Sequence, residues 1–229
     1  MTVRARRAIA EAEMVVGYRL YVEMVRGMSC YRGQAVYANG MTREAERAAR
    51  AVEAAMAGRK VAVVSGGDPG VFGMAGLVLE TIAARQCGVP VTVIPGVPAA
   101  NAAAALLGAP LTRDYATISL SDRLTPLEEI LERVRAAARA GFVLALYNPR
   151  SRSRSQPWQL TVRLLQELLP PATVVGLARN VGRGEESVDL TTVGELHQAQ
   201  VDMSTTVLVG IAATRVWNRH MITPRGYVL

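Results

Sequence analysis

The stretch from Val61 to Gly76 reads VAVVSGGDPGVFGMAG, and the rest of the chain is organised around it. Its first four residues are apolar and predict a short buried strand. A turn from Ser65 to Gly70 follows, in which three glycines allow positive φ and close approach of the backbone to a ligand. Asp68 adds a carboxylate at the carboxyl end of that strand, where open α/β sheets usually bind ligands. A glycine-rich turn alone is a weak signal, so an ordinary strand-to-helix turn is the alternative interpretation.

Helical and extended segments alternate on both sides of this stretch, which is typical of a parallel α/β sheet. Thr2 and Thr42 stand where N-caps are expected, and Val3 is among the residues expected to face inward from the first helix. The helices expected before residue 110 are 2–12, 18–25, 41–57, 73–86 and 100–107. The strands expected there are 14–16, 34–37, 61–64 and 91–94.

The pattern changes near Tyr115, where several expected strands follow one another closely. We therefore predict two α/β domains, residues 1–114 with a mostly parallel sheet and residues 115–229 with a mixed sheet and helices. The expected strands of the second domain are 115–120, 142–147, 173–178, 186–191 and 206–211, and its main expected helices are 126–140 and 158–169.

Composition restricts the class of protein. Half of the 229 residues are hydrophobic, and the formal net charge is +7. Cys30 and Cys87 are far apart in sequence, which fits a reducing cytoplasm, and with only His197 and His220 a histidine-rich metal site is not expected. No apolar run reaches the ~18 residues of a membrane span. The basic charge suits nucleic acid, an anionic membrane or a polyacidic small molecule.

Several turns, taken in order, resemble one family. Residues 65–75 (SGGDPGVFGMA), 95–110 (PGVPAANAAAALLGAP) and 118–126 (ISLSDRLTP) are similar to segments of the tetrapyrrole methylases. The segments 147–154 (YNPRSRSR) and 223–227 (TPRGY) narrow the resemblance to the branch that methylates C-17 of precorrin-3B or cobalt-precorrin-3 in cobalamin biosynthesis. The resemblance covers almost the whole chain.

This resemblance implies a class III methyltransferase fold, with S-adenosylmethionine held in a cleft between two α/β domains. It implies methyl transfer to C-17 coupled to ring contraction, giving precorrin-4 or cobalt-precorrin-4. It also implies a cytoplasmic homodimer that binds a polycarboxylate tetrapyrrole, with no nucleic acid, no membrane and no metal of its own. A superfamily relative that modifies RNA is the alternative, although the arginines are spread along the chain rather than interleaved with aromatic residues.

Two groups of candidate site residues follow. By resemblance, the turns and strand ends would contact the cofactor through Gly66, Gly67, Asp68, Val71, Pro98, Ala99, Asn148 and Val181. Asp68 could instead cap the following helix, and Asn148 could simply form the turn before Pro149.

The substrate carries many carboxylates, which arginine binds with a rigid two-pronged fork. The cluster Arg150, Arg152 and Arg154 is therefore the candidate contact, and a solvated basic loop is the alternative. Ring contraction needs acid–base help, for which Ser119, Ser121 and Asp122 are the candidates. Asp122 could instead cap the helix that begins near Pro126.

One departure from the family concerns the start of the chain. Family members open with a strand and a GxGPG turn that run into a Leu-Thr pair, and Met1-Thr2 stands at the position of that pair. We therefore expect either a true start upstream of Met1 or a truncated and inactive form that still folds.

Overall fold

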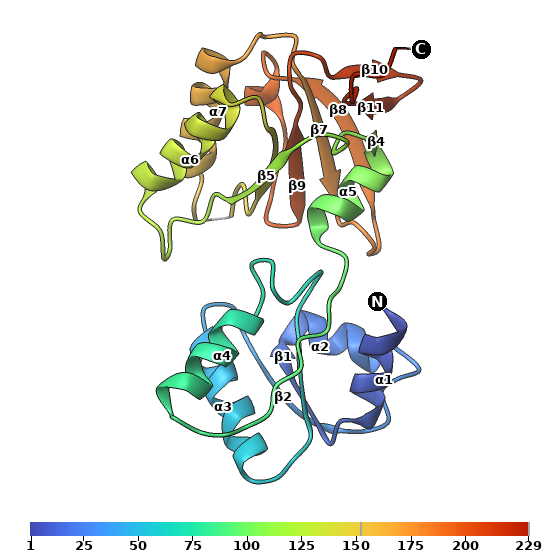
Figure 1. The fold of residues 1–229 in the computed structure, drawn as a ribbon, viewed down its shortest axis with the longest axis vertical. Helices are drawn as coiled ribbons and strands as arrows, with labels where there is room; N and C mark the ends of the chain where they lie inside the picture. The colour runs from blue at the N-terminus through green and yellow to red at the C-terminus, as the bar shows by residue number, and fades with distance from the viewer. Residues whose placement is uncertain (152, 229) are drawn as a thin grey trace. The chain divides into compact units, whose positions relative to one another are not determined.

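The computed structural model describes residues 1–151 and 153–228. The chain folds as two compact units, Met1–Pro98 and Ala99–Leu229 (Figure 1). The expected boundary at residue 115 lies inside the second unit. The reason is that helix α5 (Ala99–Leu107) buries Ala100, Ala103 and Leu107 against the sheet of the second unit, so the chain enters that unit before the helix begins.

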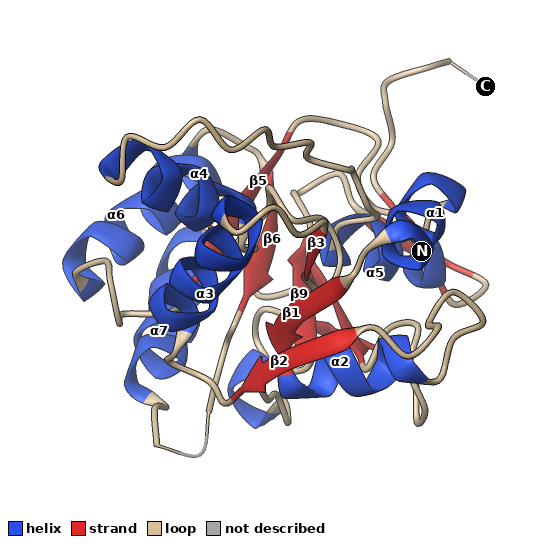
Figure 2. Cartoon of the chain, turned by 90° about the horizontal axis from the view of Figure 1, so that it is seen from below, coloured by secondary structure: helices blue, strands red, loops and turns tan. Residues whose placement is uncertain are grey.

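The first unit contains a three-stranded parallel sheet in the order β2-β1-β3 (Figure 2). Its strands are β1 (Met14–Tyr18), β2 (Ala35–Asn39) and β3 (Val61–Val64). Met14 pairs with Ala35 on one side and with Val61 on the other, so β1 is the central strand. The carboxyl ends of all three strands therefore lie at one edge of the sheet.

Helices cover both faces of this sheet. One face of β1 packs through Val15 against helices α1 (Val3–Glu11) and α2 (Arg19–Arg26). The other face packs through Met14 and Val16 against Ala51 of α3 (Glu44–Met56), which in turn lies beside α4 (Ala75–Ala84).

The expected helix ends were partly wrong. Thr2 caps α1 as predicted, because its Oγ1 accepts a hydrogen bond from the backbone N–H of Ala5 at 3.2 Å. Val3, however, is 84% exposed rather than turned inward. Thr42 does not cap α3: its φ is 66°, a left-handed conformation, and Arg43 occupies the N-cap position.

The predicted strand at 91–94 does not form, although the helix predicted before it does. Val91 and Val93 remain 42% and 44% exposed. Helix α4, which precedes this segment in the chain, is strongly apolar yet contains no buried residue. Strand β3 pairs with β1 alone and so forms an edge of the sheet. A strand is stabilised by pairing with a neighbour, and residues 91–94 pair with no strand of the described residues, although the outer edge of β3 is unpaired.

The second unit contains a mixed sheet in the order β5-β6-β9-β7-β8. Its strands are β5 (Tyr115–Ser119), β6 (Val143–Tyr147), β7 (Val174–Arg179), β8 (Ser187–Thr192) and β9 (Thr205–Val209). A small second sheet joins β4 (Gly108–Ala109), β10 (Arg215–Trp217) and β11 (His220–Ile222). The mixed sheet predicted for the second half is confirmed.

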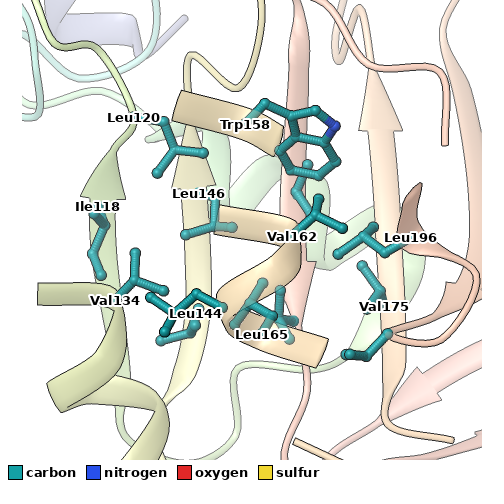
Figure 3. Close-up of a cluster of buried hydrophobic side chains, with 14 of the residues drawn as sticks. Ile118, Leu120, Val134, Leu144, Leu146, Trp158, Val162, Leu165, Val175 and Leu196 are labelled. Atoms are coloured by element: carbon teal, nitrogen blue, oxygen red, sulfur yellow. The ribbon is translucent and has the colours of Figure 1, made fainter. Parts of the chain in front are cut away.

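Both faces of the five-stranded sheet are covered. Helices α6 (Leu127–Arg139) and α7 (Gln156–Leu168) lie on one face, and α5 lies on the other (Figure 1). Figure 3 shows the core beneath α6 and α7, where Leu144 and Leu146 of β6 meet Val134 and Leu165. A single turn of 3₁₀ helix, η1 (Leu196–Gln198), adds Leu196 to this core.

None of the helices in residues 1–151 and 153–228 combines the length and the apolar character needed to cross a membrane.

Candidate functional site

In the first unit, the candidate site lies in the glycine-rich turn that follows β3. The carboxylate of Asp68 accepts two backbone hydrogen bonds, from the N–H of Gly70 to Oδ1 and from the N–H of Gly96 to Oδ2, both at 2.8 Å. The first bond closes the glycine-rich turn, and the second ties the turn at 95–99 to it. Asp68 therefore joins the two turns that were both predicted to contact a cofactor, and it does not serve as the N-cap of α4, which is Met74.

Close backbone packing explains two of the glycines in these turns. A Cβ on Gly96 would stand 2.0 Å from the carbonyl oxygen of Gly67, and a Cβ on Gly66 would stand 2.6 Å from the ring of Tyr21. Gly67 itself has a φ of 73°, which favours glycine. The two turns can therefore lie against each other only when position 96 carries no side chain, and the ring of Tyr21 can lie against the glycine-rich turn only when position 66 carries none.

The rest of the turn is held by its own backbone. The N–H of Val71 donates to the carbonyl of Asp68 at 3.2 Å, and the N–H of Met74 donates to Ser65 Oγ at 3.1 Å. Phe72 follows with a φ of 52° and is 56% exposed. The candidate residues Gly66, Gly67, Asp68 and Val71 thus belong to one closed turn.

We expect Asp68→Asn to loosen the link between the two turns. An amide has one acceptor oxygen in place of two, so either the Gly70 N–H or the Gly96 N–H loses its partner, at a cost of about 1–3 kcal/mol in the free energy of unfolding. Chemical denaturation measures this loss, and Glu80→Gln, an exposed change on α4, is the matched control. Equal stability of the two variants would contradict the role assigned to Asp68.

In the second unit, the candidate residues lie at the carboxyl edge of the five-stranded sheet. Strand β5 is parallel to β6, and both β6 and β7 are antiparallel to β9, so β5, β6 and β7 all point the same way. The segments that follow them, 119–122, 147–154 and 179–181, therefore meet at one edge. This topology brings together the predicted Ser119, Ser121, Asp122, Asn148 and Val181.

The ends of β5 and β6 are joined by side-chain hydrogen bonds. The Nδ2 of Asn148 donates to Ser119 Oγ at 3.0 Å, and the backbone N–H of Ser121 donates to the same oxygen at 3.3 Å. Asn148 adopts a φ of 53°, a conformation that asparagine tolerates better than most residues. The turn role considered for Asn148 is therefore present, together with a side-chain link to Ser119.

Arg154 also links the segments that follow β5 and β6. Its Nη1 donates to the carbonyl of Leu120, its Nη2 donates to the carbonyl of Asn148 at 2.9 Å, and its Nε lies 3.6 Å from Asp122 Oδ1. Its side chain is 12% exposed. Burial lowers the pKa of Arg154 from its usual value, and the charge of Asp122 opposes that shift. The guanidinium is thus engaged within the protein, and it fixes the position of Asp122.

The other arginines of the cluster differ from Arg154. Arg150 is exposed in the same turn, and Arg152 lies outside the described residues. Asp122 does not cap α6, whose N-cap is Pro126.

Tyr147 connects this edge with the start of α5. Its phenolic oxygen accepts a hydrogen bond from the backbone N–H of Ala100 at 2.8 Å, in the first turn of the helix that begins at Ala99. Burial raises the pKa of Tyr147, and this hydrogen bond lowers it in part. Tyr147 was not among the predicted site residues, although it stands directly before Asn148 at the end of a strand.

The turn after β7 is held by Asp202. Arg179 Nη2 lies 2.8 Å from Asp202 Oδ2, while Asp202 Oδ1 accepts hydrogen bonds from Ser204 and Thr205. The backbone N–H of Asn180 donates to the carbonyl of Ser204 at 3.1 Å. Val181 follows and packs against the core on the α5 side of the sheet.

Asp202 is expected to make the free energy of unfolding depend on pH. Burial raises its pKa, but the hydrogen bonds from Ser204 and Thr205 and the charge of Arg179 outweigh burial, so the pKa lies below its usual 3.8. A carboxyl with a depressed folded pKa stabilises the protein above its unfolded pKa and loses that effect as the pH falls through the folded pKa. In urea titrations we expect the stability gap between wild type and Asp202→Asn to be constant above about pH 5 and to shrink below it. A gap that does not vary with pH would contradict this assignment.

The histidines lie apart from these turns in the chain. His197 is in η1, with its Nδ1 3.0 Å from the carbonyl of Gly194, and His220 begins β11. Within the described part of the chain, no group of three or more His, Cys, Asp or Glu residues is placed to hold a metal ion.

Comparison with known proteins gives a consistent result. A family model described as tetrapyrrole (corrin/porphyrin) methylases matches residues 1–197. The cobalt-factor III methyltransferase of Priestia megaterium is 46% identical over 231 residues, which cover 99% of this chain but 42% of that protein. A probable cobalt-factor III C(17)-methyltransferase of Salmonella typhimurium is 45% identical over 229 residues, which cover all of this chain and 94% of that protein. The crystal structure of the methyltransferase CobJ matches with a TM-score of 0.90 at 39% identity, covering 98% of this chain and 93% of that one.

Proposed function

The chain belongs to the tetrapyrrole methylase family, and on that premise we propose that it transfers a methyl group from S-adenosylmethionine to C-17 of a precorrin-3-type macrocycle, with ring contraction. The product is then precorrin-4 or cobalt-precorrin-4, an intermediate of cobalamin biosynthesis. The observation that carries this proposal is the 45% identity with a C(17)-methyltransferase over the whole of this chain. The two relatives at 45% and 46% identity are named for cobalt-factor III, which favours a substrate that already contains cobalt.

The residues of the first unit suit S-adenosylmethionine. In the turns joined by Asp68, Gly67 is exposed and has a φ of 73°, so a ligand can approach its peptide groups closely. Backbone N–H groups in such turns favour a carboxylate, which this cofactor carries on its methionine part. When bound, S-adenosylmethionine supplies an electrophilic methyl group on a sulfonium.

The second unit supplies the remaining proposed contacts. Tyr147 holds the first turn of α5 next to Ala99, and the side chain of Asn148 is oriented by Ser119. Val181 of this unit and Pro98, the last residue of the first unit, complete the proposed cofactor residues. The task of these groups is positioning, because methyl transfer is an in-line displacement in which fixing the reactants can lower the barrier by about 7–11 kcal/mol.

For the macrocycle, we propose contacts with its carboxylates and acid–base help at its edge. Arg150 is exposed, whereas Arg154 is engaged by the carbonyls of Leu120 and Asn148, so Arg150 is the stronger candidate of the two for a carboxylate contact. Asp122, held by Arg154, and the hydroxyls of Ser119 and Ser121 are proposed to move protons during ring contraction. The net charge of +7 steers a polyanionic substrate toward the protein. We also propose that the protein acts in the cytoplasm as a homodimer.

Two measurements test the proposed function. Calorimetry is expected to show one S-adenosylmethionine, or its product S-adenosylhomocysteine, bound per chain. Incubation with S-adenosylmethionine and either cobalt-precorrin-3 or precorrin-3B, followed by mass spectrometry, is expected to show a gain of one CH₂ group. Folded protein that binds neither form of the cofactor would contradict the proposal and favour an inactive form.

A further inference from the structure

An open surface cavity of the second unit, whose lining residues are all exposed, lies away from the residues discussed so far. Its volume is about 500 Å³, and its lining comes from Thr112, Arg113 and Asp114 before β5, from residues 140–142 before β6, and from Arg225. These segments stand at the amino ends of β5 and β6, whereas the candidate catalytic residues stand at the carboxyl ends of the same strands. The cavity is therefore at the opposite edge of the five-stranded sheet.

The charge of this cavity is dominated by two guanidinium groups. Arg113 and Arg225 line it, and Asp114 is the one acidic side chain in the lining. No ion pair between residues of the described ranges 1–151 and 153–228 engages either arginine. The lining thus has an excess of positive charge, supplied by groups that bind oxyanions with two parallel hydrogen bonds.

Hydrogen-bond capping of the nearby end of α6 does not account for the two arginines. The last carbonyls of this helix accept backbone hydrogen bonds: Ala138 from the N–H of Gly141, and Ala137 from the N–H of Phe142, both at 3.1 Å. Gly141 has a φ of 77°, so the helix ends in the Schellman arrangement that satisfies its own carbonyls. The helix end therefore needs no arginine as a hydrogen-bond cap.

Hydrogen bonds at Thr223 fix the position of segment 223–227, and this position brings Arg225 to the cavity. The N–H of Thr223 donates to the carbonyl of Ala109 at 3.1 Å, the carbonyl of Thr223 accepts from Thr112 Oγ1, and the buried Thr223 Oγ1 lies 2.9 Å from Thr214 Oγ1. Gly226 then turns with a φ of 104°, and a Cβ there would stand 3.7 Å from Arg113 Nη2. Three hydrogen bonds at Thr223 therefore fix the start of the segment that carries Arg225.

From this arrangement we propose that the cavity binds a small molecule bearing a phosphate or carboxylate group, with Arg113 and Arg225 as its oxyanion ligands. The segment 223–227, which the methyl-transfer site leaves unexplained, positions one of the two arginines. This site is independent of the proposed catalytic function.

Titration of the full chain by calorimetry and by backbone NMR, with inorganic phosphate in one arm and citrate in the other, tests the proposal. We expect one site per chain, with shifts centred on residues 112–114 and 225–226, and binding that weakens as salt is added. Arg113→Ala and Arg225→Ala are each expected to weaken binding at least tenfold. Arg163→Ala, an exposed arginine on α7, is expected to bind as wild type does.

The two arms separate a phosphate ligand from a polycarboxylate ligand, since the tighter probe identifies the class. Absence of binding in both arms would overturn the proposal. So would unchanged binding in Arg113→Ala and Arg225→Ala, or loss of binding in Arg150→Ala, which would place the anion at the other edge of the sheet. Thermal melts of each variant establish that the chain remains folded.

Discussion

Replacing Arg154 with methionine is expected to separate the ends of β5 and β6 and to abolish methyl transfer. Methionine keeps much of the side-chain volume but donates no hydrogen bond, so the carbonyls of Leu120 and Asn148 and the carboxylate of Asp122 all lose their partner. Removing one member of a buried charged pair costs about 3–5 kcal/mol, and the partial exposure of Asp122 places this variant at the lower end. Denaturation curves measure the stability, and the methyl-transfer assay measures the activity.

The matched control for this variant is Arg150→Met in the same turn. Arg150 is exposed, so its loss is expected to leave stability within about 0.5 kcal/mol of wild type while raising KM if it contacts the macrocycle. Arg154→Lys keeps the charge but cannot reach both carbonyls, and it is expected to fall between the wild type and Arg154→Met. If Arg154→Met were as stable as Arg150→Met, the assignment of Arg154 as the link between these strand ends would be wrong.

Replacing Gly96 with alanine is expected to cost at least tenfold in affinity for S-adenosylmethionine. The added Cβ would stand 2.0 Å from the carbonyl oxygen of Gly67, so the turn at 95–99 must move away from the glycine-rich turn. That movement also breaks the hydrogen bond from the Gly96 N–H to Asp68. We expect a loss of about 1–3 kcal/mol in stability from overpacking, in addition to the loss of binding.

Gly88→Ala is the control, because no atom lies within 4 Å of a Cβ at that position. Calorimetric titration with the cofactor compares the two variants. Equal affinity would show that the two turns are not required to touch for binding. If Gly96→Ala lost stability but kept its affinity, the contact between the turns would be structural alone.

The fold class and most of the second unit could be predicted from the sequence, because local patterns decided them. Alternation of apolar and polar residues located β5, and short apolar runs located β3 and β7. The segment 91–94 carries an equally clear pattern but forms no strand. A strand also needs a neighbouring strand to hydrogen-bond with, and the four residues alone do not determine whether that neighbour is present.

The candidate site, too, was only partly predictable from the sequence. The glycine-rich turn, the turn at 95–99, the segment 118–122 and the segment 147–154 were all recognisable as motifs along the chain. Their connections were not, since each one joins residues far apart in sequence: Asp68 to Gly96, Asn148 to Ser119, and Tyr147 to Ala100. Arg154, which belongs to an exposed-looking basic cluster, is instead bound to the backbone of two strand ends.

In the sequence by itself, the motifs that resemble the tetrapyrrole methylases indicated the family and the ligand-type turns, while local composition and periodicity indicated the parallel and mixed sheets. Only the tertiary structure decided which polar groups are used internally and which remain exposed. That distinction depends on long-range packing, which brings a carboxylate, a phenol and a guanidinium to backbone groups elsewhere in the chain. It also showed that the final segment positions Arg225 beside Arg113, at the edge of the sheet opposite the candidate catalytic residues.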